Sequence, residues 1–539
     1  MTAVLDPVSA APRLHRDRRR WVRGSAAAVL LLWSLTGAGL FSGPVLNPPG
    51  LATFGRFATA ALFPAHDTEF LAVLAEAALV TVAYAALGAA LAVALGAAGA
   101  IAVARTTWGR RRAGWILTRA ALSVPRGLHE AVWGLLLVNV LGLDPWVGVL
   151  AIGIPYGAVT AKVFADLLEE VPRGAYEALL GAGAGRVGAA LYGLLPPAAG
   201  GLLSYSFYRL ECAVRSAVVL GLIGAGGLGY QLSLSFASLR WEQVWAVVYA
   251  LAALCALSDL GGRAVRRRVA EPRPAEGARP SRDRLLTGAV LATLALVAWS
   301  WWFLAVSPAT LASERTLDQL AYVLGAAWPP AADADLLGAI ASAAVDTVQM
   351  SVIAVALATG GSVVLCGPAA RPRGRVHLGR RAVGALVRGV LLLLRAVPPP
   401  VWALVLLFVL LPGVLPGALA LAVYTLGVLG RLAAEAREEV DPRPRAALQA
   451  AGASPAGGWL YGVLPALSGP MLALAVDRWE VAIRDTVLVG LLGAGGIGVL
   501  LSGRIAAFDW PAVATVLAAT VLLTLVVDLV GARARSTLR

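Results

Sequence analysis

Charge is scarce in this sequence. Only 14% of its 539 residues are charged, whereas a soluble domain carries roughly 25%. A run of about 20 apolar residues can cross a bilayer as one helix, and helices satisfy their own backbone hydrogen bonds in lipid. Four charge-free stretches exceed that length: 77–104, 285–313, 347–370 and 396–430. We therefore expect an all-α polytopic membrane protein, embedded in the lipid bilayer.

Residues suited to metal or redox chemistry are also few. The three cysteines, Cys212, Cys255 and Cys366, lie in or beside apolar segments without paired spacing, which is typical of buried thiols. The four histidines form no cluster with metal-ligand spacing, so no metal and no cofactor is expected. The sequence also lacks the G-x-x-x-x-G-K-[ST] motif that cradles ATP phosphates. We expect no catalytic residues and no ATP hydrolysis by this chain.

The excess of basic residues, +14 in net charge, has a membrane explanation. Arginines gather at the ends of apolar runs, at 13–23, 105–112, 263–268 and 371–375. This is the pattern in which positive charges stay on the cytoplasmic side, and it predicts that both termini are cytoplasmic. No single basic face with interleaved aromatic residues is present, so no nucleic-acid partner is expected.

The chain is a tandem duplication. Shifted by 269 residues, RLECAVRSAVVLGLIGAGGLG (209–229) lies over RWEVAIRDTVLVGLLGAGGIG (478–498), with 12 of 21 positions identical. The same shift pairs LYGLLP (191–196) with LYGVLP (460–465) and Trp133 with Trp402. A constant offset over more than a hundred residues predicts two copies of one folding unit.

Each copy divides into about six predicted spans, about 12 in all, arranged as two parallel six-helix repeats. The predicted spans of the first copy are 24–42, 71–104, 114–141, 145–168, 196–222 and 242–262. Those of the second are 285–307, 338–366, 382–411, 413–437, 465–491 and 510–531. The connections 43–70 and 308–337 carry little positive charge, so we expect them outside the cell.

These spans define six regions. They are an N-terminal tail with the first span and external loop (1–70), the first repeat domain (71–262), a charged, proline-rich cytoplasmic linker (263–284), the first span and external loop of the second copy (285–337), the second repeat domain (338–531) and a basic tail (532–539).

A glycine pattern occurs once in each copy. Gly224, Gly226 and Gly229 spell G-x-G-x-x-G, and Gly493, Gly495 and Gly498 repeat it, with Gly227 and Gly496 adding a fourth glycine to each. In a dinucleotide-binding fold this turn follows a strand and precedes a helix. Here it follows a long apolar helical pattern instead. We expect a break in a membrane helix, where glycine permits positive φ and close backbone approach.

Charges within the spans form repeated i, i+4 arrangements. Glu211 with Arg215 and Glu480 with Arg484 lie on one helix face in the favourable order. Lys162 with Asp166 and Arg431 with Glu435 form a second set. Two readings stay open for Arg215 and Arg484: structural ion pairs, or two symmetric arginines that steer an anionic substrate past the glycine break.

The loop before the fifth span carries a recognisable motif. Glu177-Ala178-Leu179 is followed by Gly183 and then by Leu195-Pro196. This spacing resembles the EAA loop of type I ABC importer permeases, which docks on the ATPase subunit. The second copy keeps Gly452 and Leu464-Pro465 but has Ala446-Ala447 at the first two positions. Because the second copy lacks this glutamate, the sequence leaves open whether the two halves couple equally to the ATPase.

Two further stretches narrow the resemblance. YRLECAVRSAVVLGLIGAGGLG (208–229) and RGLHEAVW (126–133) are similar to the phosphonate importer permease family. The resemblance covers roughly 70–262 and 338–531, so each half looks like one complete permease. It implies a non-enzymatic channel subunit of the bacterial cytoplasmic membrane for phosphonate, phosphate or phosphite. Its implied partners are two ABC ATPase subunits and an extracytoplasmic binding protein.

One alternative class remains, a 12-helix secondary transporter with parallel halves, driven by an ion gradient. Dependence of transport on ATP would distinguish the two classes. On the importer reading, the glycine breaks lie near the external gate of the translocation path.

Overall fold

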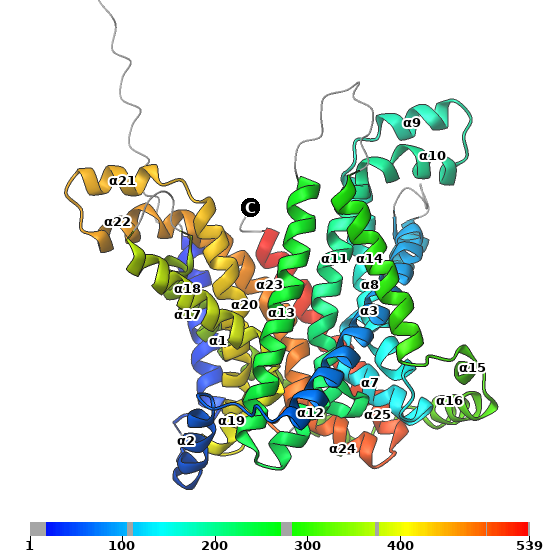
Figure 1. Ribbon diagram of the computed structural model, residues 1–539, viewed down its shortest axis with the longest axis horizontal. Helices are drawn as coiled ribbons and strands as arrows, with labels where there is room; N and C mark the ends of the chain where they lie inside the picture. The colour runs from blue at the N-terminus through cyan, green and yellow to red at the C-terminus, as the bar shows by residue number, and fades with distance from the viewer. Residues whose placement is uncertain are drawn as a thin grey trace, which may run out of the picture.

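The structure is a computed structural model that describes residues 18–41, 43–104, 112–270, 283–371, 377–491 and 493–536. Within these ranges the regular secondary structure is helical, apart from an isolated bridge between Leu46 and Leu410. Two bundles stand side by side, and each carries a helical hairpin at the same end of the molecule (Figure 1). The predicted all-α fold is confirmed.

The helices of the two copies follow each other in the same order. In the first copy they are α1 (Arg18–Gly37), α2 (Leu51–Ala60), α3 (Thr68–Val103), α5 (Arg112–Ala121), α6 (Ser123–Gly127), α7 (Glu130–Leu141), α8 (Trp146–Glu170), α9 (Gly174–Gly181), α10 (Arg186–Gly193), α11 (Leu195–Leu220), α12 (Gly227–Ala237) and α13 (Trp241–Ala270). In the second they are α14 (Arg284–Phe303), α15 (Pro308–Leu311), α16 (Glu314–Ala326), α17 (Ala334–Ala369), α18 (Leu378–Ala396), α19 (Pro399–Val409), α20 (Val414–Glu439), α21 (Arg443–Ala450), α22 (Pro455–Gly462), α23 (Leu464–Gly490), α24 (Ile497–Ala506) and α25 (Trp510–Ser536).

Fewer helices qualify as membrane spans than the twelve predicted. Seven described helices are long and apolar enough to cross a membrane, and three pairs bent by 67°, 96° and 55° raise the number to ten. The other two predicted spans, 24–42 and 114–141, contain the shorter apolar helices Gly24–Gly37 and Glu130–Leu141. The third span is broken in both copies because His129 and Pro398 adopt extended backbone and begin a new helix.

The first span of each copy packs on the other copy. Helix α1 lies against α17, and α14 lies against α3 (Figure 1). Helix α14 also contacts the start of α8 through an edge-on pair of rings, Trp146 and Trp301, with centroids 5.7 Å apart. The Trp146 indole also donates to the backbone oxygen of Ser307 at 2.7 Å. Neither repeat therefore buries its surface alone, and the two halves are interlocked.

The predicted linker is shorter than expected. Helix α13 continues to Ala270, and α14 begins at Arg284 after Asp283, whose carboxylate accepts from the amide nitrogens of Leu285 and Leu286. The rest of the predicted linker, 271–282, lies outside the described residues, as do the basic segments 105–111 and 372–376. The helices of the predicted external connections, α2, α15 and α16, lie at the end opposite the hairpins (Figure 1).

The two bundles meet through equivalent surfaces. Val132 of α7 is buried among residues of α24 and α25, while Val401, 269 positions later in α19, is buried among residues of α12 and α13. Each copy thus buries the residue at the equivalent position in the core of the other copy, as an isologous two-fold interface requires. The cavity described next lies at this junction.

Candidate translocation site

The glycine patterns break the fifth span of each copy. After α11 and after α23 the chain turns through glycines with positive φ: Gly224 (104°), Gly226 (91°) and Gly227 (74°), and Gly493 (90°), Gly495 (91°) and Gly496 (73°). Residues with a Cβ rarely adopt this region. Because a helix and not a strand precedes each turn, the structure agrees with a helix break and not with a dinucleotide site.

Close packing explains the remaining glycine of each pattern. A Cβ on Gly229 would lie 1.9 Å from the backbone oxygen of Val218, and one on Gly498 would lie 2.1 Å from that of Val487. The short helix after the break therefore folds directly against the helix before it.

A threonine from the second span fixes each break. The hydroxyl oxygen of Thr81 accepts from the Leu228 amide at 2.9 Å, and that of Thr347 accepts from the Ile497 amide at 3.0 Å. These bonds satisfy a first-turn N–H of α12 and of α24, which would otherwise lack a partner. The two breaks are thus built alike and rigidly held, although the sequence did not identify either threonine.

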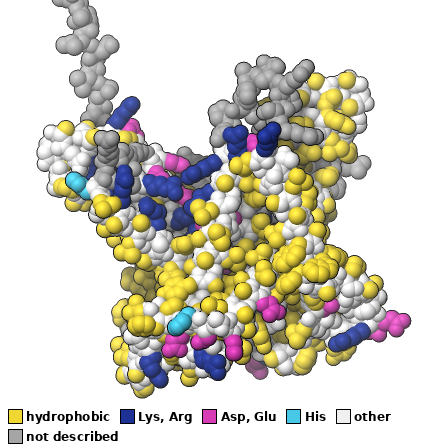
Figure 2. Space-filling model, viewed as in Figure 1, with side chains coloured by type: hydrophobic (Ala, Val, Ile, Leu, Met, Phe, Trp, Pro, Cys, Tyr) yellow, Lys and Arg dark blue, Asp and Glu magenta, His cyan; other side chains and the backbone are white. Residues whose placement is uncertain are grey.

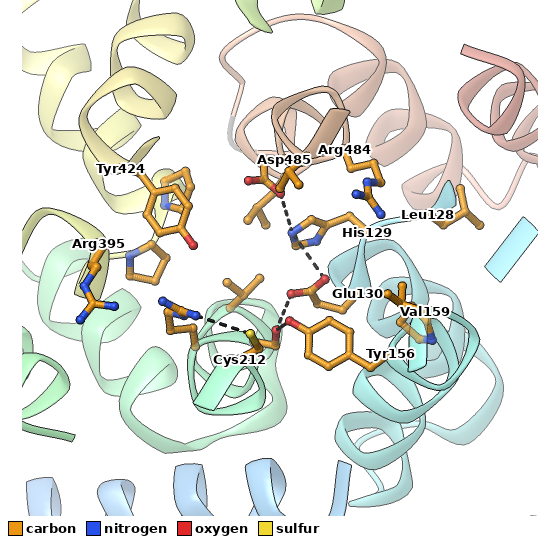
Figure 3. Close-up of a pocket in the computed structure, with 18 of the residues that line it drawn as sticks. Leu128, His129, Glu130, Tyr156, Val159, Cys212, Arg395, Tyr424, Arg484 and Asp485 are labelled. Atoms are coloured by element: carbon orange, nitrogen blue, oxygen red, sulfur yellow. Dashed lines mark hydrogen bonds and ion pairs between the residues drawn. The ribbon is translucent and has the colours of Figure 1, made fainter. Parts of the chain in front are cut away.

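A polar cavity of about 240 Å³ lies between the two bundles. Six arginines line it, against two carboxylates, those of Glu130 and Asp485. The arginines form three pairs at the 269-residue offset: Arg126 and Arg395, Arg209 and Arg478, and Arg215 and Arg484. Figure 3 shows side chains of both copies converging on this space. The repeat thus concentrates positive charge at the junction of its two halves.

The predicted ion pairs of Arg215 and Arg484 do not form. Glu211 accepts from Arg266 of α13 at 2.7 Å, and Glu480 accepts from Arg535 of α25 at 2.5 Å. These partners, again 269 residues apart, lie on the last span of each copy. The i, i+4 expectation was wrong because each glutamate faces that neighbouring span and not the cavity.

Arg215 and Arg484 consequently have no carboxylate partner among the described residues. The Arg215 guanidinium donates to the sulfur of Cys212 at 3.6 Å. Arg484 donates to two backbone oxygens, those of Glu480 (3.4 Å) and of Arg126 (3.1 Å). Both side chains line the cavity, where an anion can reach them.

Arg126 and Arg395 instead join the two copies. Arg126 lies 3.4 Å from Asp528 of α25, and Arg395 is bonded to Asp259 of α13. Each ion pair crosses from one copy to the other, and the two aspartates are 269 residues apart. These two arginines therefore hold the bundles together at the wall of the cavity.

A chain of polar groups runs across the cavity. The Ser216 hydroxyl donates to Glu130 at 2.5 Å, and the Tyr156 hydroxyl lies 2.6 Å from Ser216. The Nε2 atom of His129 lies 3.6 Å from Glu130 and 3.5 Å from Asp485 of the other copy (Figure 3). Sequence reasoning did not identify His129, Glu130 or Asp485 as site residues, because their proximity depends on the docking of the two halves.

The second predicted set of i, i+4 pairs holds in one copy only. Arg431 donates to Glu435 at 2.9 Å and also reaches Asp259 at 3.1 Å. In the first copy, Asp166 accepts from Arg119 at 2.9 Å instead of from Lys162.

The predicted docking loops form exposed hairpins. Helices α9 and α10 make one and α21 and α22 the other, both projecting from the same end (Figure 1). Glu177 and Ala178 are exposed on α9, as are Ala446 and Ala447 on α21, while Leu179 is partly buried. Each hairpin turns at its motif glycine, with φ of 87° at Gly183 and 88° at Gly452. Leu195-Pro196 and Leu464-Pro465 begin the long helices α11 and α23.

This architecture, two similar helical bundles with paired hairpins and a central polar cavity, is that of a membrane transport component. The family model for the binding-protein-dependent transport system inner membrane component matches twice, at residues 93–271 and 376–537. The chain belongs to this family and has its type I ABC permease fold. It is a multi-pass, non-enzymatic transport permease in which two permease domains are fused in tandem.

Among curated proteins, the chain is similar to the phosphate-import permease protein PhnE of Mycolicibacterium smegmatis. The two are 28% identical over 403 residues, which cover 71% of each. It is also 32% identical to the phosphite transport system permease protein PtxC of Stutzerimonas stutzeri over 241 residues, 45% of this chain and 85% of that protein. No solved structure matches the chain.

Proposed function

We propose that this chain is the channel subunit of an ABC importer for a phosphorus oxyanion: phosphate, phosphite or a phosphonate. The names of the related permeases support this substrate class. The cavity supports it independently. Three of its six arginines, Arg209, Arg215 and Arg484, form no ion pair with a carboxylate among the described residues, and they outnumber the two carboxylates that line it. The excess positive charge favours an anion.

The observation that carries the proposal is the state of Arg215 and Arg484. Both line the cavity, and neither pairs with a carboxylate among the described residues. A guanidinium presents a planar set of N–H donors that matches two oxygens of a phosphate-like group. An intramembrane charge without a protein partner is costly, so an oxyanion that supplies the missing acceptors is the ligand that fits.

We assign the exposed hairpins α9–α10 and α21–α22 to ATPase docking. Two ATPase subunits would bind there, one to each hairpin. This end of the molecule, towards which Lys and Arg side chains gather on the face shown in Figure 2, would face the bacterial cytoplasm. Helix α1 begins and α25 ends at the same end (Figure 1), so both termini would be cytoplasmic. An extracytoplasmic binding protein would deliver the substrate at the opposite end, where α12 and α24 lie.

We place the external gate at the two glycine breaks. They connect the arginine-bearing helices α11 and α23 to the short helices α12 and α24 at that opposite end. A shift of these short helices would open or close the cavity towards the binding protein.

The test is ATPase stimulation in reconstituted vesicles. The chain is co-purified with its candidate ATPase and binding protein, and phosphate, phosphite, methylphosphonate and methionine are added in turn. Stimulation by one phosphorus oxyanion and not by methionine is expected. Stimulation by methionine alone, or the absence of any stimulation, would contradict the proposed substrate class.

A further inference from the structure

Two carboxylates stand in a cavity that is otherwise built for an anion. We propose that Glu130 and Asp485 make this cavity selective for oxyanions that carry an ionisable O–H proton, such as hydrogenphosphate, over fully deprotonated ones such as sulfate. This inference rests on the proposed function, because it concerns the same cavity. It names one feature of the substrate, an ionisable O–H proton, that this chain itself recognises.

The hydrogen bonds around Glu130 leave its carboxylate as an acceptor. Ser216 has one hydroxyl proton and directs it at Glu130, so the proton shared by Tyr156 and Ser216 comes from Tyr156. Ser216 therefore donates to Glu130 and is itself the acceptor for Tyr156, an arrangement that suits the ionised form of the carboxylate. An ionised carboxylate offers about four acceptor positions, so Glu130 has capacity to spare.

His129 cannot satisfy both acids. Its Nδ1 atom accepts from the Ala131 amide at 3.1 Å, so a neutral ring carries its proton on Nε2. The Nε2 atom that carries this single proton lies 3.6 Å from a carboxylate oxygen of Glu130 and 3.5 Å from one of Asp485. The other carboxylate oxygen of Asp485 is bonded to no described residue, and the side chain is 15% exposed.

An oxyanion drawn to Arg215 and Arg484 must therefore enter beside two acceptors. Sulfate brings only lone pairs at neutral pH and would be repelled by the carboxylates, with no donor to compensate. A phosphorus oxyanion that keeps a proton can donate it to Asp485 or Glu130 while its other oxygens accept from the arginines. A site built to receive a substrate hydrogen discriminates strongly against an analogue that lacks it.

The two acids come from divergent positions of the repeat. The position equivalent to Glu130 is Pro399, and the position equivalent to Asp485 is Ser216. Each copy therefore contributes one carboxylate from a different helix, and both reach the same histidine. Because the two copies are fused in one chain, every cavity contains one copy that carries Glu130 and one copy that carries Asp485.

The test measures anion binding to the full-length chain in lipid nanodiscs. Dissociation constants for inorganic phosphate and for sulfate are measured at pH 7 for the native chain, for Glu130→Gln and for Asp485→Asn. We expect the native chain to bind phosphate about 10- to 100-fold tighter than sulfate, the range for an unmatched hydrogen bond to a charged group. Each variant should bring this ratio close to one, chiefly by improving sulfate binding. Glu242→Gln, an exposed carboxylate distant in sequence from the cavity residues, is the control.

The outcomes separate the two proposals. Equal affinities in the native chain, or an unchanged ratio in both folded variants, would overturn the selectivity inference and leave the oxyanion function in place. Failure of the native chain to bind either anion would overturn both. Because each variant is measured separately, a folding defect in one of them leaves the other as the test.

Discussion

Glu211 bonds to Arg266 at 2.7 Å and not to Arg215, the arginine one turn away on its own helix. The second copy repeats the relationship with Glu480 and Arg535. The acids thus attach the fifth span to the sixth in each half. The arginines, which the acids would otherwise neutralise, remain available to the central cavity.

Removal of either unpaired cavity arginine should strongly reduce uptake while the amount of protein in the membrane stays the same. Arg215→Ala and Arg484→Ala each delete a charged donor, and such hydrogen bonds contribute about 1.5–3 kcal/mol. We expect uptake of labelled phosphate to fall at least about tenfold in each single variant. Arg268→Ala, which removes a partly exposed ion pair with Asp283 outside the cavity and the glycine breaks, should leave uptake near the native rate. Native uptake in both cavity variants would contradict the assignment of these arginines.

Disruption of the glycine breaks should impair transport. Gly226 and Gly495 have φ of 91°, and valine at such positions is strained by roughly 1–3 kcal/mol each. In the double variant Gly226→Val, Gly495→Val, we expect normal membrane insertion and strongly reduced uptake. Gly261→Val serves as the control, because an added Cβ there meets nothing within 4 Å. Unchanged uptake in the double variant would refute the gate.

The two ion pairs between the copies should differ in strength. Asp259 and Arg395 are 6% and 8% exposed, whereas Asp528 and Arg126 are 28% and 21% exposed. Breaking a buried pair leaves an unpaired buried charge and costs about 3–5 kcal/mol, while a more exposed pair contributes less. Asp259→Asn should therefore lower the melting temperature in detergent more than Asp528→Asn does. Equal decreases in melting temperature would contradict the expectation that the more buried ion pair is the stronger one.

Glu177 should make the first hairpin the stronger of the two ATPase contacts. An exposed ion pair contributes about 0.2–1 kcal/mol, so Glu177→Ala should reduce transport-coupled ATP hydrolysis about two- to fivefold. Ala446→Glu places the missing carboxylate on the second hairpin and should not reduce it. If Glu177→Ala leaves coupled hydrolysis unchanged, the carboxylate has no part in docking.

The repeat made most of the architecture predictable. The 269-residue offset paired the two loops that form hairpins and the two glycine breaks, and the structure builds each pair alike. The break within the third span was not predicted. The offset could also have revealed the cavity arginines and the aspartates Asp259 and Asp528, because their residue types match in both copies.

Other features depend on tertiary packing that no local pattern records. The exchange of α1 and α14 between the copies is one such feature, and the pairing of Glu211 with the last span is another. His129 and Asp485 are far apart in sequence and have no identical counterparts in the repeat, so only the docking of the two halves brings them together.

The most direct test of the central claim is phosphate uptake by vesicles that contain the chain, its ATPase and its binding protein. Uptake is measured with ATP on the hairpin side and no ion gradient, and then with a proton or sodium gradient and no ATP. We predict uptake in the first condition alone, and its loss in the double variant Arg215→Ala, Arg484→Ala. Uptake driven by the gradient without ATP would contradict this account and identify a secondary transporter.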